Sequence, residues 1–348
     1  MASPSLVVFA PSPLLTITVE AAKTPRQEIH LHAGGQGFWV ARMAALLGAQ
    51  VSLCCALGGE SGAVLRGLIA RENVELLDVE CAAPNGVYIH ARCEGVREEL
   101  ARTEAKRLSR HEADELYGVA LSAALDASVA LLTGVDPPTV LESEIYRRLA
   151  GDLRSNGVQV IADLAGAPLK SALAGGLDLL KISEEEILAE GLARSGSADD
   201  LLEALDGLHD AGARTVLISR AEEPALVLDG SRGRYLELTG PQVETLEPRG
   251  TGDSMFAALG ASLASGQRLD AALRLAMAAG CLNATRHGLG TGTRQQIQQL
   301  SGHIEIEDVT PRGDAARGRA TRSDGGGGEG DRSAQARGRS GVRSDRWT

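Results

Sequence analysis

The amino-acid sequence predicts an α/β fold in which a mainly parallel central sheet is flanked by helices and carries a small β-sheet lid. Two observations support this prediction. Short, β-rich apolar runs alternate with amphipathic runs from the start of the chain to about residue 300, which is typical of a doubly wound sheet. Two further segments, at about residues 14–32 and 86–104, alternate in side-chain character with no helix between their strands, and they predict the lid.

Five of the apolar runs are nearly continuous, as expected for strands that are buried on both faces of a parallel sheet. They are Leu6–Ala10, Val51–Ala56, Val129–Thr133, Val158–Asp163 and Thr215–Ser219. The amphipathic runs between them predict helices that cover the sheet, and these span Phe38–Leu47, Ser61–Glu72, Glu112–Leu125, Leu141–Ser155 and Ala198–Ala211. Capping boxes are expected to open several of the helices, with Thr139 before Glu142 and Ser109 before Glu112.

The two segments that interrupt this rhythm pair Thr16–Glu20 with Glu28–His32, and Gly86–Cys93 with Glu98–Thr103. Alternation over such short runs indicates strands with two different faces. We expect a small antiparallel sheet that stands away from the main one. Beside a substrate cleft, such a sheet would close as a lid and exclude water during group transfer.

Residues 1–310 are expected to form one domain, and residues 311–348 a disordered tail. Gly, Arg, Ser and Asp dominate the tail, which includes the run Gly325–Gly328. Such a composition cannot bury enough apolar surface to offset the entropy that is lost on ordering.

The composition excludes several classes of protein. The formal net charge is −11 and only 3% of the residues are aromatic, so the chain lacks the basic stripe and the stacking platform of a nucleic-acid binder. No apolar run reaches the roughly 18 residues of a membrane span, and the first ten residues do not resemble a signal peptide. The five cysteines include no C-x-x-C pair, which favours reduced thiols over disulfides or a zinc site. We therefore expect a cytoplasmic protein with a small-molecule partner, and no binding to nucleic acid or membrane.

The stretch from Arg249 to Ser254 combines glycines with an acid at the start of an apolar-periodic helix. Small residues at this point leave backbone N–H groups that can face an anion, and the helix dipole adds to their attraction. The dipole also favours the ionised form of Asp253, which could then take a proton from an attacking hydroxyl. An aspartate that only caps the helix is the alternative.

A second glycine cluster, Gly34-Gly35-Gln36-Gly37, follows the predicted lid strand and opens the next helix. It is a poor match to a dinucleotide fingerprint, because the third glycine position is Val40, and a dehydrogenase is therefore disfavoured. Consecutive glycines would let the backbone approach a substrate closely. A plain tight turn is the alternative.

Residues 181–186 follow a strand-like run and hold a lysine, a serine and three glutamates. Glu186 could orient a water bound to Mg²⁺, which keeps much of its hydration in proteins. Ser183 and Glu186 also have the spacing of an ordinary capping box. No G-x-x-x-x-G-K-[ST] loop and no G-x-S-x-G elbow occur in the chain, so a P-loop kinase and a hydrolase of the elbow type are excluded.

Taken in order, three segments resemble the pfkB, or ribokinase-like, carbohydrate kinases, and most of all the branch with 1-phosphofructokinase and tagatose-6-phosphate kinase. The segments are Ala33–Arg42, Leu57–Gly62 and Gly250–Ser254, and the resemblance runs from about Leu6 to Thr293. It implies a ribokinase-like fold whose β lid closes over a sugar.

The resemblance also implies an ATP-dependent phosphotransferase that phosphorylates a hydroxyl of a sugar or sugar phosphate. Gly250, Thr251 and Gly252 would form the anion hole for the transferred phosphoryl group, and Asp253 would be the general base. Mg²⁺, held near Glu186 through water, would neutralise the phosphates of ATP. The ATP-binding residues implied by the same matches are Lys181, Ser183, Ser219, Arg220, Gly250 and Gly252.

The matching positions place the acceptor against Thr16, Gly34, Gly35, Gln36 and Trp39, and a homodimer through the lid is a further expectation. Three of these residues differ from the pattern of the branch: Thr16 replaces an acid, Gln36 a lysine and Trp39 an asparagine. On the nucleotide side, Ala221 and Pro224 replace glycines. Two alternatives therefore stay open: a kinase of a non-phosphorylated sugar or nucleoside, and a non-catalytic sugar- or nucleotide-binding protein on the same fold.

Overall fold

The structure is a computed structural model that describes residues 5–20, 27–93, 96–246, 248–286 and 292–310. Residues 1–309 make one compact unit, and the fold below is that of this unit. The tail expected at residues 311–348 lies outside the described residues. None of the helices within these ranges is long and apolar enough to cross a membrane.

A ten-stranded sheet forms the centre of the unit, in the order β14-β13-β12-β11-β10-β9-β8-β1-β4-β5. Neighbouring strands from β11 to β5 are parallel, and β12, β13 and β14 add an antiparallel edge. The expectation of a mainly parallel sheet is confirmed, whereas the antiparallel edge was not predicted. The strands are β1 Ser5–Phe9, β4 Gln50–Gly58, β5 Glu75–Cys81, β8 Val129–Thr133, β9 Gln159–Asp163, β10 Leu179–Ser183, β11 Thr215–Ser219, β12 Ala225–Asp229, β13 Arg234–Thr239 and β14 Glu305–Val309.

Helices cover both faces of this sheet. Because strand side chains alternate between faces, Val7 and Phe9 of β1 pack in one core cluster and Leu6 and Val8 in the other. The first cluster takes α3 Arg110–Leu125, α4 Glu144–Ser155, α5 Gly166–Gly175, α6 Glu184–Ala189 and α7 Ala198–Asp210. The second takes α1 Gln36–Leu46, α2 Gly59–Ile69, α8 Thr251–Ala264, α9 Leu269–Ala284 and α10 Arg294–Ser301.

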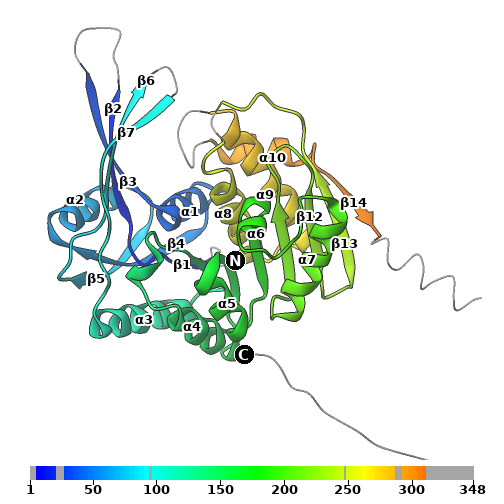
Figure 1. Ribbon diagram of the computed structural model, residues 1–348, viewed down its shortest axis with the longest axis horizontal. Coiled ribbons are helices and arrows are strands. Elements are labelled where there is room, and N and C mark those ends of the chain that lie inside the picture. Colours follow the sequence, from blue (N-terminus) through cyan, green and yellow to red (C-terminus); the bar gives the residue numbers. More distant parts are fainter. Residues whose placement is uncertain (1–4, 21–26, 94–95, 247, 287–291, 311–348) are drawn as a thin grey trace, which may run out of the picture. The chain divides into compact units, whose positions relative to one another are not determined.

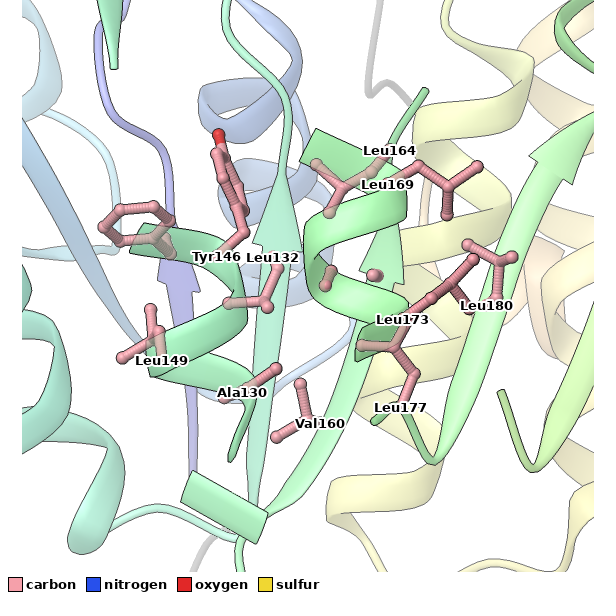
Figure 2. Packing of buried hydrophobic residues seen from close by; sticks show 14 of the residues in the cluster. Ala130, Leu132, Tyr146, Leu149, Val160, Leu164, Leu169, Leu173, Leu177 and Leu180 are labelled. Carbon is pink, nitrogen blue, oxygen red and sulfur yellow. The ribbon is translucent and has the colours of Figure 1, made fainter. Parts of the chain in front are cut away.

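The first core cluster joins α4 and α5 to the middle of the sheet (Figure 2). Side chains of both helices point towards residues of β8, β9 and β10. Tyr146 of α4 is fully buried, meets Phe9 edge to face at 5.7 Å, and donates a hydrogen bond to the carbonyl oxygen of Thr133 at 3.0 Å. This bond fixes α4 against the carboxyl end of β8.

The lid is a separate four-stranded sheet in the order β3-β2-β6-β7 (Figure 1). Its strands are β2 Leu14–Glu20, β3 Glu28–Gly34, β6 Val87–Cys93 and β7 Val96–Thr103, drawn in blue and cyan. The two outer pairs are antiparallel, but the central strands β2 and β6 run parallel. The expectation of a purely antiparallel lid is therefore wrong, because both central strands leave the main sheet at the same edge.

Of the two capping boxes expected at Ser109 and Thr139, the structure has the first and lacks the second. Ser109 caps α3 together with Glu112, as predicted. The box at Thr139 is wrong: Thr139 lies in a short 3-10 helix, Pro138–Val140, and α4 begins only at Glu144. Pro137 and Pro138 fix φ and lack N–H groups, so the chain makes a single tight turn here and starts the helix later.

Candidate active site

The expected site residues gather at the carboxyl ends of the parallel strands, where ligands bind in open α/β sheets. Two cavities lie here. The strand-end cavity, about 310 Å³, is lined by residues that include Gly35, Gln36, Asp163 and Glu186. The basic cavity, about 420 Å³, lies between the lid, α1 and Arg249, and both cavities share Leu14 and Gly35.

The first turn of α8 has the features of an anion cradle. Gly250 is the N-cap residue and adopts a left-handed conformation with φ of 72°, with no side-chain cap on the helix. Gly252 lies over Lys181, and a Cβ atom there would be only 2.6 Å from the lysine Nζ. The Thr251 hydroxyl is buried with no hydrogen-bond partner among the described residues. Backbone N–H groups and an unpaired hydroxyl thus remain available at this helix terminus.

Lys181 and Asp163 form a buried ion pair beneath this cradle. The lysine Nζ lies 3.0 Å from Asp163 Oδ2, and the two side chains are 6% and 2% exposed. Burial opposes the charge on Lys181, but Asp163 and Glu186 outweigh it and raise the pKa of the lysine. A permanent cation is therefore held directly under Gly252.

Asp253 is half-buried in the same first turn. Burial raises its pKa to about 7, with a further increase from Asp163, while Lys181 opposes the shift and Glu186 adds to it. A carboxyl group with this pKa exchanges its proton near neutral pH, which suits a general base.

Ser183 and Glu186 are joined as a capping box at the start of α6. The Ser183 hydroxyl accepts from the Glu186 N–H at 3.2 Å, and Glu186 Oε2 accepts from the Ser183 N–H at 2.9 Å. Glu186 nevertheless lines the strand-end cavity. In the described part of the chain no three His, Cys, Asp or Glu side chains are grouped to hold a metal ion.

Gln36 connects two strand-end loops. Its Oε1 accepts from the N–H of Gly134 at 2.9 Å, and its Nε2 donates to the carbonyl oxygen of Asp163 at 3.4 Å. Its side chain lines the strand-end cavity and not the basic cavity. The lysine that the family pattern carries here is thus replaced by a side chain that is engaged within the protein.

The basic cavity is lined by residues from the lid, α1 and the start of the α8 turn. Four arginines and two histidines line it, and no acidic residue is among the described lining: His32, Arg42, His90, Arg92, Arg97 and Arg249. Opposite charges at close range stabilise one another, whereas like charges repel. Arg42 already lies 3.5 Å from Glu72 Oε2, and the remaining positive charge of the lining favours an anionic ligand.

His90 is the most deeply buried of these groups, at 2% exposure. Its Nε2 lies 3.3 Å from Thr18 Oγ1, while Nδ1 has no partner among the described residues. Burial and the charges of Arg97, Arg92, Arg249 and His32 lower its pKa. The pKa of His32 is lowered as well, by burial, His30 and Arg42. Both histidines are consequently neutral in the empty cavity near neutral pH.

Three of the expected acceptor residues lie at the basic cavity: Thr16, Gly35 and Trp39 line it. The Trp39 ring lies 5.7 Å from the guanidinium of Arg42, a distance that allows a cation–π interaction. Gly34 packs beside Thr16, since a Cβ atom there would be 2.6 Å from the threonine Oγ1.

Sequence reasoning missed the lid cations of the basic cavity. A signal was present, because Tyr88, His90 and Arg92 alternate along β6 and therefore share one face of the strand. The alternation alone predicts a strand, and it does not indicate that the polar face of the strand meets a ligand.

The structure places Arg220 differently from a solvated arginine. Its Nε donates to Glu184 Oε2 at 2.9 Å, its Nη2 donates to the carbonyl oxygen of Gly196 at 3.0 Å, and the side chain is 10% exposed. Ser219, the last residue of β11, pairs with Ser183 at the end of β10. Contact of these residues with ATP stays a prediction.

A parallel sheet with an anion cradle and a carboxylate at its carboxyl edge, beside a small second sheet, is the arrangement expected of a kinase that transfers a phosphoryl group. The model of the pfkB family of carbohydrate kinases matches residues 15–296. The chain belongs to this family, whose members are ATP-dependent carbohydrate kinases that use Mg²⁺.

Curated relatives include two phosphofructokinases. Isozyme 2 of ATP-dependent 6-phosphofructokinase from Escherichia coli is 27% identical over 275 residues, covering 78% of this chain and 87% of that enzyme. The 1-phosphofructokinase of Borreliella burgdorferi is 23% identical over 277 residues, covering 80% and 88%. Among solved structures, phosphofructokinase-2 from Escherichia coli in complex with potassium is 25% identical with a TM-score of 0.75, and the match covers 87% of this chain and 99% of that one.

Proposed function

We propose that this kinase phosphorylates a hydroxyl of a sugar that already carries a phosphate, in the manner of a 1-phosphofructokinase-like hexose-phosphate kinase. The observation that carries the proposal is the basic cavity, whose six cationic or ionisable groups have no acid among the described lining residues. A phosphate dianion is the sugar substituent that such a cavity would bind best. The phosphofructokinase relatives support the same substrate class.

In the proposed reaction Asp253 takes the proton of the acceptor hydroxyl. The hydroxyl oxygen forms a bond to the γ-phosphorus of ATP while the bond from that phosphorus to the β-phosphate oxygen breaks, and ADP leaves with the bridging oxygen. The cradle of Gly250, Thr251 and Gly252 would stabilise the charge of the transferred group. Lys181 would add a positive charge beneath it, supported by its position under Gly252.

Mg²⁺ bound near Glu186 through water would screen the negative charge of the ATP phosphates. We assign ATP contacts to Lys181, Ser183, Ser219 and Arg220 as part of the proposal. The guanidinium of Arg220 already forms an ion pair with Glu184 beyond the end of β11. A phosphate of ATP would bind to this guanidinium beside Glu184 or in place of it.

For the acceptor, Thr16, Gly34, Gly35 and Trp39 would surround the sugar, and the lid cations would hold its phosphate. Gln36 would act on the acceptor through the loops that it connects, since its amide bonds to Gly134 and Asp163. The cations of the basic cavity offset the missing lysine at this position, and this favours a phosphorylated acceptor over a free sugar or nucleoside.

We also propose a cytoplasmic location and a homodimer formed through the lid. The location is supported by Cys54, Cys55, Cys81 and Cys281, which carry free thiols. The dimer is supported by the apolar face of the lid, where Ile29 is 64% and Leu31 44% exposed. Exposed apolar side chains of this size, two residues apart on one face of a strand, suggest a covered surface.

Turnover of ATP with Mg²⁺ against a panel of acceptors tests the substrate class. The panel holds fructose 1-phosphate, fructose 6-phosphate, free fructose, ribose and adenosine. We expect the highest kcat/KM with a sugar phosphate, and we expect Arg92→Met to reduce it by about 10- to 100-fold for that acceptor only, the scale of one charge-assisted contact. A preference for a free sugar or nucleoside would overturn the proposal.

A further inference from the structure

A single buried side-chain amide links the segments that precede both central lid strands, β2 and β6, to the main sheet. Asn85, 2% exposed, lies two residues before the start of β6. Its Oδ1 accepts from the N–H of Gly58 at 2.9 Å. Its Nδ2 has three oxygens within hydrogen-bonding distance: Ser12 Oγ at 3.1 Å, the Pro13 carbonyl at 3.3 Å and the Ala56 carbonyl at 3.0 Å.

These partners belong to three separate segments. Ser12 and Pro13 immediately precede β2, Ala56 and Gly58 lie at the carboxyl end of β4, and Asn85 itself precedes β6. The backbone adds to the junction, because Leu15 N–H donates to the Gly86 carbonyl at 3.0 Å. The two strands that carry the lid side of the basic cavity therefore start from one fixed point.

The segment Leu57–Gly62, which the phosphoryl-transfer chemistry does not use, is shaped around this amide. Ser61 Oγ donates to the backbone carbonyl oxygen of Asn85 at 2.8 Å. A side chain at Gly62 would place its Cβ 2.9 Å from Asn85 Oδ1. The motif thus provides both a donor and the space that the asparagine requires.

Only an amide of this length satisfies the junction. It must accept from one buried N–H and donate to buried carbonyl oxygens, and asparagine has both kinds of atom. An aspartate would place its oxygens against the carbonyls of Pro13 and Ala56, and an alanine would leave buried groups unpaired, which costs more than the bonds themselves contribute. Among the described residues one ion pair, Arg102 with Asp136, also links the lid to the strand-end loops, but it is solvent-exposed and contributes little.

We propose that Asn85 is a positioning residue for the acceptor: it fixes β2 and β6, and with them Thr16, His90 and Arg92, beside the anion cradle. The inference rests on the proposed function for the identity of the acceptor. Because ATP contacts lie on the main sheet and α8, loss of the junction should weaken acceptor binding and leave ATP binding unchanged.

The test compares Asn85→Asp, Asn85→Ala and the milder Ser12→Ala, which removes one hydroxyl partner of the amide. All variants carry Trp347→Phe, so that Trp39, which lines the basic cavity, is the remaining tryptophan. Its fluorescence reports the Kd of fructose 6-phosphate and of fructose 1-phosphate, and a separate titration gives the Kd of ATP. We expect Asn85→Asp to raise the sugar phosphate Kd by at least about tenfold, with ATP changed by less than about twofold, and Ser12→Ala to follow in the same direction.

Asn156→Ala is the matched control, because Asn156 is exposed and its amide donates to the Asp152 carbonyl at the end of α4. It should leave both Kd values unchanged. The inference would be overturned if Asn85→Asp changed the Kd of the sugar phosphate and the Kd of ATP by the same factor. It would also be overturned if neither Kd changed.

Amide hydrogen exchange of the unliganded protein gives a readout that needs no acceptor. Asn85→Ala should speed exchange at Leu15 and along β6 by at least about tenfold, with β8 unchanged. Uniform acceleration across both sheets would contradict a local junction. If the wild type binds no sugar phosphate, the proposed acceptor fails, and this exchange pattern still decides the role of Asn85.

Discussion

Asp253 shares its surroundings with two carboxylates, Asp163 and Glu186, and one ammonium group, Lys181. The ion pair of 3.0 Å between Lys181 and Asp163 neutralises one of the negative charges. A base with a pKa near 7 can take a proton from a hydroxyl and later release it to water. Burial of Asp253 raises its pKa most, and the charges of these neighbours adjust the pH range in which the proposed base is ionised.

Replacement of Lys181 tests this balance. Lys181 lowers the pKa of Asp253, so Lys181→Met should raise that pKa and move the acid limb of the kcat/KM profile from about pH 7 to higher pH. The sign follows because only ionised Asp253 acts as a base, and activity is lost as pH falls through its pKa. A pH profile of kcat/KM for the sugar phosphate measures the shift, and an unmoved or lowered acid limb would contradict it.

The same variant should be less stable, because it leaves Asp163 buried without its partner. Breaking a buried pair in this way costs about 3–5 kcal/mol. Lys170→Met is the matched control, since Lys170 is exposed and lies 4.0 Å from Glu190. It should leave both the profile and the unfolding midpoint near those of the wild type.

For single residues, the sequence predicted the glycines and the acid at the start of α8 as site residues. Small residues before a helical pattern indicate a helix N-terminus that can bind an anion. It also favoured the capping box at Ser183, which the structure has. It could not pair Lys181 with Asp163, because the two residues meet only through the parallel register of β9 and β10. Nor could it show that Arg220 is held by Glu184.

Among the elements, the lid has two chemically different faces. Thr16, Thr18, His90 and Arg92 line the basic cavity from one face, and Ile29 and Leu31 are exposed elsewhere on the same sheet. Strand periodicity produces this division, because neighbouring residues point to opposite sides. One sheet can therefore serve both a ligand and an interface.

Binding of a phosphorylated acceptor should be coupled to proton uptake by the lid. The pKa of His90 is lowered by burial and neighbouring arginines, and a bound dianion would raise it by supplying the opposite charge. The complex then holds more protons than the free enzyme, so affinity should fall as pH rises through the pKa of His90 in the complex. Calorimetry in two buffers with different ionisation enthalpies measures the uptake.

His90→Gln should reduce this uptake, whereas His111→Gln should not, because His111 is exposed on α3. Equal binding enthalpies in the two buffers for the wild-type enzyme would contradict a protonation of the lid.

The main-sheet strands from β1 to β11 that we expected from apolar runs are present, since burial on both faces leaves a strong pattern. Three features escaped prediction for physical reasons. The antiparallel strands β13 and β14 have mixed burial patterns. The parallel pairing of β2 and β6 depends on where the strands enter the lid, and the two prolines before Thr139 delay the start of α4.

For the whole molecule, the fold brings residues of the lid, of α1, α6 and α8, and of the main-sheet strands β9, β10 and β11 to one edge of the sheet. The cradle of α8, the pair beneath it and the lid come from positions as far apart in sequence as Thr16 and Asp253. The sequence order of the motifs led to the family, and the family match over residues 15–296 confirms it. The class of acceptor was harder to predict from the sequence, because the cations of the basic cavity come together only in the folded chain.

The proposed dimer predicts a concentration-dependent mass. Charges on the apolar lid face should prevent association, so the double variant Ile29→Lys and Leu31→Lys should be monomeric at micromolar concentration, since buried unpaired charges are costly in an interface. Leu125→Lys is the control, because Leu125 is 47% exposed at the end of α3. Sedimentation velocity reports the mass, and a dimer that survives both lid substitutions would place the interface elsewhere.

The central claim is that Asp253 is the general base of a sugar-phosphate kinase, and single-turnover transfer from labelled ATP tests it most directly. The measurement compares Asp253→Asn with wild type, using Asp200→Asn, in the first turn of α7, as the control for losing an acid near a helix start. We predict that Asp253→Asn lowers the rate of transfer to the sugar phosphate by at least about 100-fold while the Kd of ATP stays near that of the wild type. Transfer at a rate close to the wild type would contradict the account.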